Sequence, residues 1–170
     1  IIAECLIMSK EYKLIPYKSL GDLVFGMSRD EVQQLLGKPI SSIKYGFPIQ
    51  ERILEDYGFF YTLFSKQDIL EAVQFFPQYT KEEIVWSYCD LSIQLTDSRE
   101  AMLSGLNSFT DDLLIDEDED VAECYYSKKL GLKFFFPYDE DEDVVSLIVH
   151  DLHCYDEEEQ YLKDLENGVE

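Results

Sequence analysis

Residues 25–39 have the sequence FGMSRDEVQQLLGKP, which carries signals for both the start and the end of a helix. Ser28 can accept a hydrogen bond from the backbone N–H of Glu31, and the Glu31 side chain can reach back to Ser28, which is the capping-box arrangement. Apolar residues recur at helical spacing from Val32 onward, and a glycine and a proline follow the last leucine within three residues. We therefore predict a helix of about two turns that begins after Ser28.

Four runs rich in β-branched and aromatic residues follow this helix, as is typical of strands. They cover residues 40–45, 52–57, 59–64 and 69–76. Gly58 separates the second run from the third, and residues 65–68 separate the third from the fourth; both are suitable hairpin connections. The sequence predicts a short helix followed by a meander of four antiparallel strands.

The same order of elements returns roughly 70 residues later. Residues 96–100 can cap a second helix that ends near Asn107, and strand-like runs follow at residues 113–115, 121–127, 132–136 and 144–150. Three landmarks recur at similar offsets: Ser28-Arg29 with Ser98-Arg99, Gly58 with Gly131, and Asp68 with Asp143. Shared order at shared spacing favours a tandem duplication. We expect an α+β fold of two similar halves, each a short helix packed on an antiparallel sheet of about four strands.

The motif GMSRDEV at residues 26–32, the LGKP ending at residues 36–39 and the strands after them resemble a bacterial module. The helix-then-meander unit is similar to that of the β-lactamase-inhibitor proteins and of the small outer-membrane assembly lipoproteins. Two units in one chain resemble the tandem form of the inhibitor proteins, a form also seen among cytoplasmic immunity proteins that neutralise toxins delivered between bacteria. The resemblance covers most of residues 20–150. The chain departs from the secreted members in showing neither a signal peptide nor a lipobox cysteine, and its second copy lacks the LGxP ending. The resemblance implies the fold, on a scaffold that hosts several functions.

The repeat sets the expected domain boundaries. The first helix-plus-meander unit covers residues 10–78, the second covers residues 79–155, and an acidic tail with a short amphipathic helix covers residues 156–170. Residues 1–9 are expected to be a leader or an added extension, because Met8-Ser9-Lys10 is typical of a translation start. Four scattered cysteines without a CxxC pair indicate reduced thiols and a cytoplasmic protein.

Charge is the strongest compositional feature. The chain has 36 Asp and Glu against 14 Lys and Arg, a formal net charge of −22 over 170 residues. Residues 111–170 alone hold 21 acids and four lysines. Such a field repels phosphate backbones and anionic lipid surfaces and steers basic partners toward the protein. We therefore expect a basic protein partner, no nucleic acid and no membrane.

Few residues point to catalysis or metal binding. His150, His153 and Cys154 form a His-x-x-His-Cys pattern, but no second ligand pair accompanies it, so three ordinary neighbours are the preferred interpretation. An EF-hand loop needs glycine at its sixth position and glutamate at its twelfth, and neither of the acidic runs that begin at Asp116 and Asp139 meets this requirement. The Gly-x-Ser-x-Gly elbow of serine hydrolases is absent from the sequence. We expect no enzymatic activity, no metal site and no cofactor.

Two acidic runs with the sequence DEDED stand out, at residues 116–120 and 139–143. Each run precedes a predicted strand, and loops separated by two strands of a meander emerge at the same end of the sheet. Ten carboxylates are therefore expected at one rim. Solubility needs a net charge of only about 2 to 8, so this concentration favours a binding role. The predicted partner-binding residues are Asp116, Glu117, Asp118, Glu119, Asp120, Asp139, Glu140, Asp141, Glu142 and Asp143.

Consecutive aromatic residues occur in both meanders, as FFY at residues 59–61 and FFF at residues 134–136. Neighbouring side chains of a strand point to opposite faces of a sheet. Either other parts of the fold cover both faces, or one face is a binding surface.

These features lead to two hypotheses for the function. The first is an immunity-type inhibitor that neutralises a basic toxin, with a nuclease as the leading example, by placing an acidic surface over its active site. The alternative is an acidic chaperone or adaptor for a secreted effector.

Overall fold

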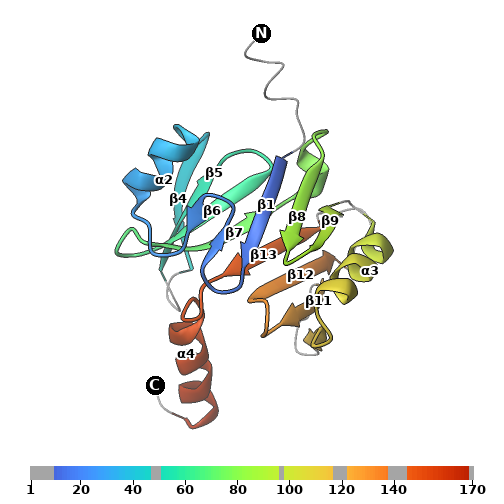
Figure 1. Ribbon diagram of the computed structural model, residues 1–170. Helices are drawn as coiled ribbons and strands as arrows, with labels where there is room; N and C mark the ends of the chain where they lie inside the picture. The colour runs from blue at the N-terminus through green and yellow to red at the C-terminus, as the bar shows by residue number, and fades with distance from the viewer. Residues whose placement is uncertain (1–9, 47–50, 96–97, 117–121, 138–144, 169–170) are drawn as a thin grey trace.

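The computed structural model describes residues 10–46, 51–95, 98–116, 122–137 and 145–168. Within these ranges the chain is an α+β protein with two sheets and three α-helices (Figure 1). Residues 1–9, for which the sequence predicts a leader or an added extension, lie outside the described residues. The elements in chain order are β1 (Lys10–Ile15), β2 (Ser19–Leu20), β3 (Leu23–Val24), α2 (Arg29–Leu36), β4 (Ser41–Tyr45), β5 (Arg52–Asp56), β6 (Phe60–Ser65), β7 (Leu70–Phe75), the 3₁₀ turn η1 (Pro77–Tyr79), β8 (Ile84–Tyr88), β9 (Leu91–Leu95), α3 (Arg99–Phe109), β10 (Leu114–Asp116), β11 (Ala122–Ser127), β12 (Leu132–Pro137), β13 (Ser146–His150) and α4 (Asp156–Glu166).

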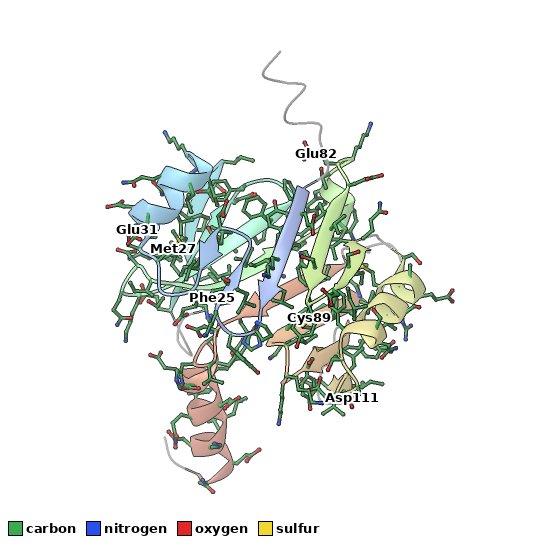
Figure 2. All side chains as sticks on the ribbon, in the orientation of Figure 1. Phe25, Met27, Glu31, Glu82, Cys89 and Asp111 are labelled. Carbon is green, nitrogen blue, oxygen red and sulfur yellow. The ribbon has the colours of Figure 1, made fainter. Side chains whose placement is uncertain are left out.

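Helices α2 and α3 begin where the sequence predicts. The Ser28 Oγ accepts from the Glu31 backbone N–H at 3.2 Å, and a Glu31 carboxylate oxygen accepts from the Ser28 N–H at 3.5 Å, so the capping box of α2 is confirmed. Figure 2 shows Glu31 on this helix. The Ser98 Oγ accepts from the Ala101 N–H at 3.3 Å at the start of α3. This helix ends two residues later than predicted, because its last residue, Phe109, is buried and extends its apolar face into the core.

The strands predicted for the two meanders form one continuous sheet. Its order is β10-β11-β12-β13-β7-β6-β5-β4, so each meander supplies four consecutive strands. The meanders join because β7 pairs antiparallel with β13, with Val73 opposite Val149. The expectation of two sheets of about four strands is corrected here: the observed sheet is larger. Pairing β7 with β13 satisfies backbone groups that two separate sheets would each leave unpaired at an edge.

The arginine that begins each of these two helices forms an ion pair with its meander. Arg29 of α2 places Nη2 3.2 Å from Glu55 Oε2 on β5, the second strand of the first meander. Arg99 of α3 pairs with Glu123 on β11, the second strand of the second meander. Each ion pair thus ties a helix start to the equivalent strand of its own meander.

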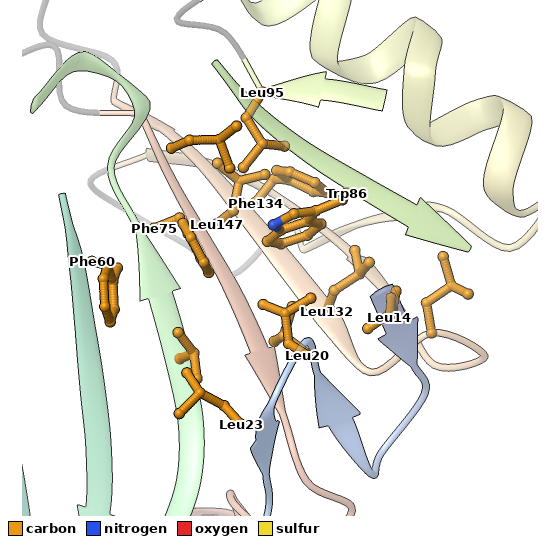
Figure 3. Close-up of a cluster of buried hydrophobic side chains, with 14 of the residues drawn as sticks. Leu14, Leu20, Leu23, Phe60, Phe75, Trp86, Leu95, Leu132, Phe134 and Leu147 are labelled. Atoms are coloured by element: carbon orange, nitrogen blue, oxygen red, sulfur yellow. The ribbon is translucent and has the colours of Figure 1, made fainter. Parts of the chain in front are cut away.

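A five-stranded sheet, which the sequence did not predict, covers one face of the large sheet, here called the inner face. Its order is β3-β2-β1-β8-β9, and its central pair β1·β8 is parallel, with Tyr12 opposite Trp86. Trp86 is fully buried between the two sheets, with its ring centroid 5.5 Å from that of Phe75 (Figure 3). This core also contains Leu14, Leu20, Phe134 and Leu147.

The opposite, outer face of the large sheet carries a smaller apolar cluster. Leu63, Ala72, Ile148 and Cys154 are buried in it. The FFF run divides between the faces as alternation requires: Phe134 and Phe136 are buried on the inner face, and Phe135 packs partly buried on the outer face. Other side chains therefore pack against these aromatic residues on both faces of the large sheet, although the outer cluster is small. None of the helices in the described residues is long and apolar enough to cross a membrane.

Candidate partner-binding surface

Of the ten predicted partner-binding residues, the structure describes only Asp116. It ends β10 and lies opposite Cys124 of β11. The other nine, at residues 117–120 and 139–143, lie outside the described residues.

The strand ends next to the two acidic runs can be placed. Ala122, which starts β11, lies directly opposite Pro137, which ends β12. Ser146, which starts β13, lies opposite Phe135. The residues that flank both runs therefore meet at one end of the second meander.

A cleft lies beside this meander, with a volume of about 600 Å³. One wall is the outer side of β11 and β12, with Tyr126 and Lys133, and the facing wall is the start of α4, with Asp156 and Glu159. Asp116 also borders the cleft, so the first acidic run starts at its edge. This arrangement combines aromatic, basic and acidic groups around one opening.

Aromatic contacts organise the floor of the cleft. The Lys133 Nζ lies 3.8 Å from the centroid of the Tyr155 ring, within cation–π range. The His150 ring packs edge-on against Tyr155, with centroids 4.9 Å apart, and His150 also contacts the Tyr17 ring. The Tyr17 hydroxyl donates to the Lys128 carbonyl oxygen. These rings hold one another in place before any ligand arrives.

His150 is held in its neutral form. Burial lowers its pKa to about 4, and the nearby Lys133 and Arg52 charges act in the same direction. Its Nδ1 lies 2.8 Å from the Asp151 carbonyl oxygen, which accepts a hydrogen bond from the neutral imidazole in the tautomer with hydrogen on Nδ1. The histidine is therefore an uncharged packing element of the cleft at neutral pH.

The segment that leads into α4 is clamped by the first meander. Arg52 of β5 is 5% exposed, and its guanidinium donates to the Cys154 Sγ at 2.8 Å and to the Cys154 carbonyl oxygen. The same guanidinium lies 3.3 Å from the Glu71 carboxylate of β7. Burial raises the pKa of Glu71 to about 7, against the opposing effect of Arg52, and raises the pKa of the Cys154 thiol to about 12. The clamp fixes where α4 leaves the sheet.

The His-x-x-His-Cys pattern does not converge. His150 faces the cleft, the His153 Nδ1 lies 2.8 Å from the Asp156 carboxylate in solvent, and Cys154 accepts from Arg52. Among the described residues there is no group of three His, Cys, Asp or Glu side chains placed to hold a metal ion.

Sequence reasoning missed the cleft, although two signals were present. Alternation along β12 places Lys133 on the face opposite to Leu132 and Phe134, which marks it as an outer residue. The helix predicted for the tail corresponds to α4, whose start forms the facing wall of the cleft. The contact of Arg52 with Cys154, 102 residues apart, left no sequence signal.

No family model, curated protein or solved structure matches this chain. The resemblance to the helix-plus-meander module therefore stays a prediction.

Proposed function

We propose that this protein is an immunity-type inhibitor that acts in the cytoplasm by binding a basic toxin domain, with a nuclease as the leading example, and covering its active site. The observation that carries the proposal is the position of Ala122 opposite Pro137, because it brings together the strand ends from which both acidic runs depart. A nuclease presents a positive cleft to phosphate, and an acidic surface of this kind is complementary to it.

The protein would have a binding role and no catalytic role of its own. His150 in the cleft and Cys154 beside it are the histidine and the buried cysteine nearest the opening, and both have pKa values unsuited to a general base or a nucleophile. The pKa of His150 is about 4, and the pKa of Cys154 is about 12. A nucleophile or general base usually has a pKa tuned toward the working pH. These two values support binding, without a cofactor, as the main activity.

The proposal includes a fold of two similar halves produced by duplication. The equivalent ion pairs Arg29–Glu55 and Arg99–Glu123 support it, because helix start and second strand match in both halves at offsets of 70 and 68 residues. The strand order of the large sheet, in which each half contributes four consecutive strands that meet at β7 and β13, supports it as well. The two halves would share one architecture, and the second half would carry the acidic runs that bind the partner.

The experiment pairs the protein with the product of the reading frame beside its gene. The test variant replaces Glu117, Asp118, Glu119 and Asp120 by the corresponding amides. The control variant does the same at Glu11, Asp22, Glu83 and Asp90, which are exposed acids outside the second meander, so both variants lose the same charge.

Stopped-flow association would be measured from about 20 to 150 mM salt, together with relief of the neighbour's toxicity. We expect the test variant to associate about tenfold more slowly at low salt with a flatter salt dependence, and the control variant to change much less. A neighbour that is not toxic, or a toxin that this protein does not bind, would overturn the proposed function.

A further inference from the structure

We propose that the cleft between α4 and the outer side of β11 and β12 is a docking groove for a basic, amphipathic segment of the protein partner: one large apolar or aromatic side chain enters the cleft, and flanking lysines and arginines lie along α4. This inference rests on the proposed function and names where on the molecule, and through which chemistry, the partner is held.

The apolar surface of α4 is the first support for the groove. None of the eleven described residues of this helix is buried. Tyr161, Leu162 and Leu165 are 37%, 50% and 53% exposed, and Leu152 before the helix is 62% exposed. Figures 1 and 2 show α4 extending away from both sheets, with its side chains pointing outward. Leu162 follows Glu159 by three residues, so it extends the side of α4 that borders the cleft, whereas Tyr161 and Leu165, at i and i+4, lie on another side of the helix.

The low intrinsic stability of such a helix is the second support. Isolated helices shorter than about 12 to 15 residues are marginal in water, and most helical stability in proteins comes from a packed apolar face. The buried Arg52 nevertheless fixes Cys154, two residues before α4 begins. A helix that is anchored at one end and unpacked along its length is suited to complete its packing against a partner.

Charge selects the occupant of the groove. Helix α4 carries six acids and one lysine, and Asp156 and Glu159 face the cleft together with Asp116. Lys128 and Lys133 also line the cleft, and the Lys133 ammonium is directed onto the Tyr155 ring. The floor of the cleft is thus nearly balanced in charge and aromatic, whereas the α4 wall is strongly acidic. An apolar group fits the floor and cationic groups fit the wall.

The size and position of the cleft agree with this occupant. A cleft of about 600 Å³ falls in the range of sites that hold a drug-sized group, and can therefore hold one or two large side chains. Its edge at Asp116 is the start of the first acidic run. A partner segment in the cleft would therefore also meet Asp116, the first residue of that run.

The test uses a displayed library of random 12-residue peptides selected against the full chain. We expect enriched peptides in which lysines or arginines flank an aromatic or large aliphatic residue. NMR titration of one enriched peptide should shift the signals of Tyr126, Leu152 and Leu162.

Two variants then probe the contact. Leu162→Ser, here called the stripe variant, removes the exposed leucine on the cleft side of α4, and we expect the affinity for the peptide to fall about tenfold or more. Leu35→Ser is the matched control, because Leu35 of α2 is also 50% exposed and lies elsewhere on the molecule, and it should leave the affinity unchanged. Tyr126→Ala should also weaken binding. This variant alters the cleft wall and leaves α4 intact, so it tests the groove even if the helix unfolds in the stripe variant.

The outcomes separate the two proposals. Basic peptides whose binding survives the stripe and Tyr126 variants but is lost when residues 117–120 are neutralised would overturn the groove and leave the proposed function standing. Enrichment without a basic bias would count against both, and no enrichment would overturn the groove. A dimer measured by light scattering that dissociates in the stripe variant would make a second copy of the chain the occupant, which also overturns the proposal.

Discussion

The two meanders of the large sheet have the same strand count and the same helix ion pair, yet they differ sharply in charge. Residues 41–75 contain five acids and three basic residues, whereas residues 114–150 contain eleven acids and three basic residues. The ion pairs differ too: Glu55 is 1% exposed and also accepts from the Gln33 amide at 2.9 Å, whereas the Arg99 side chain is about half exposed. The two meanders thus share a strand count and a helix ion pair, while the second carries the larger excess of acids.

The largest expected effect concerns these two ion pairs. Glu55→Ala should lower the free energy of unfolding by about 2 to 3 kcal/mol, because it leaves Arg29 and Gln33 without their buried acceptor. Glu123→Ala should cost less than about 1 kcal/mol, since Arg99 can turn to water. Urea denaturation of both variants checks the difference. Equal costs would show that burial does not distinguish the two pairs.

The next effect concerns the strands where the meanders join, and it depends on pH. The raised pKa of Glu71 on β7 means that its contribution to stability is complete below its unfolded pKa, near 4.5, and is lost as the pH rises through about 7. The lowered pKa of His150 on β13 has the opposite sign: its contribution is complete above about 6.5 and is lost as the pH falls through about 4. Between pH 4.5 and 6.5 the two contributions therefore change in opposite directions.

The difference between Glu71→Gln and the wild type isolates the contribution of Glu71. Relative to the wild type, the free energy of unfolding of this variant should increase by about 2 kcal/mol from pH 4.5 to 6.5. His150→Asn should show the reverse trend relative to the wild type over the same range. Denaturant unfolding at three pH values measures both, and taking differences from the wild type cancels the overall charge effect. Parallel pH profiles for all three proteins would contradict the assignment.

The smallest effect concerns the excess of acids in the second meander. Replacing Asp139, Glu140, Asp141 and Glu142 by their amides should raise the free energy of unfolding by about 0.5 kcal/mol, because it relieves like-charge repulsion. Neutralising Glu11, Asp22, Glu83 and Asp90 should raise it less, since those acids are dispersed outside the second meander. Melting curves at low salt compare the two. A loss of stability in the first variant would mean that the run has a structural role.

The sequence was sufficient for the local elements of the large sheet. The capping box at Ser28 and the alternation of apolar residues place α2, α3 and the strands of both meanders within about two residues of their observed bounds. These signals lie within a few residues of one another along the chain, so they can be read without knowing the fold.

The remaining features depend on contacts between distant residues. β2 and β3 are two residues long and leave no periodic pattern, and the parallel pair β1·β8 joins segments that are about 70 residues apart. For the same reason the sequence could not show that β7 pairs with β13 or that Arg52 holds Cys154. The acidic runs could be named from the sequence, but the cleft beside them needs residues from six separate segments.

The pairing of β7 with β13 also affects how the chain is made. β13 lies in the middle of the large sheet but follows its partner β7 by about 70 residues along the chain. When a chain has left the ribosome only as far as β12, β7 is an unpaired edge strand. β12 is unpaired on one side as well, because β13 lies between these two strands in the finished sheet. Completion of the sheet must wait for residues 146–150, which makes the interval between the synthesis of β7 and that of β13 the one most exposed to aggregation and proteolysis.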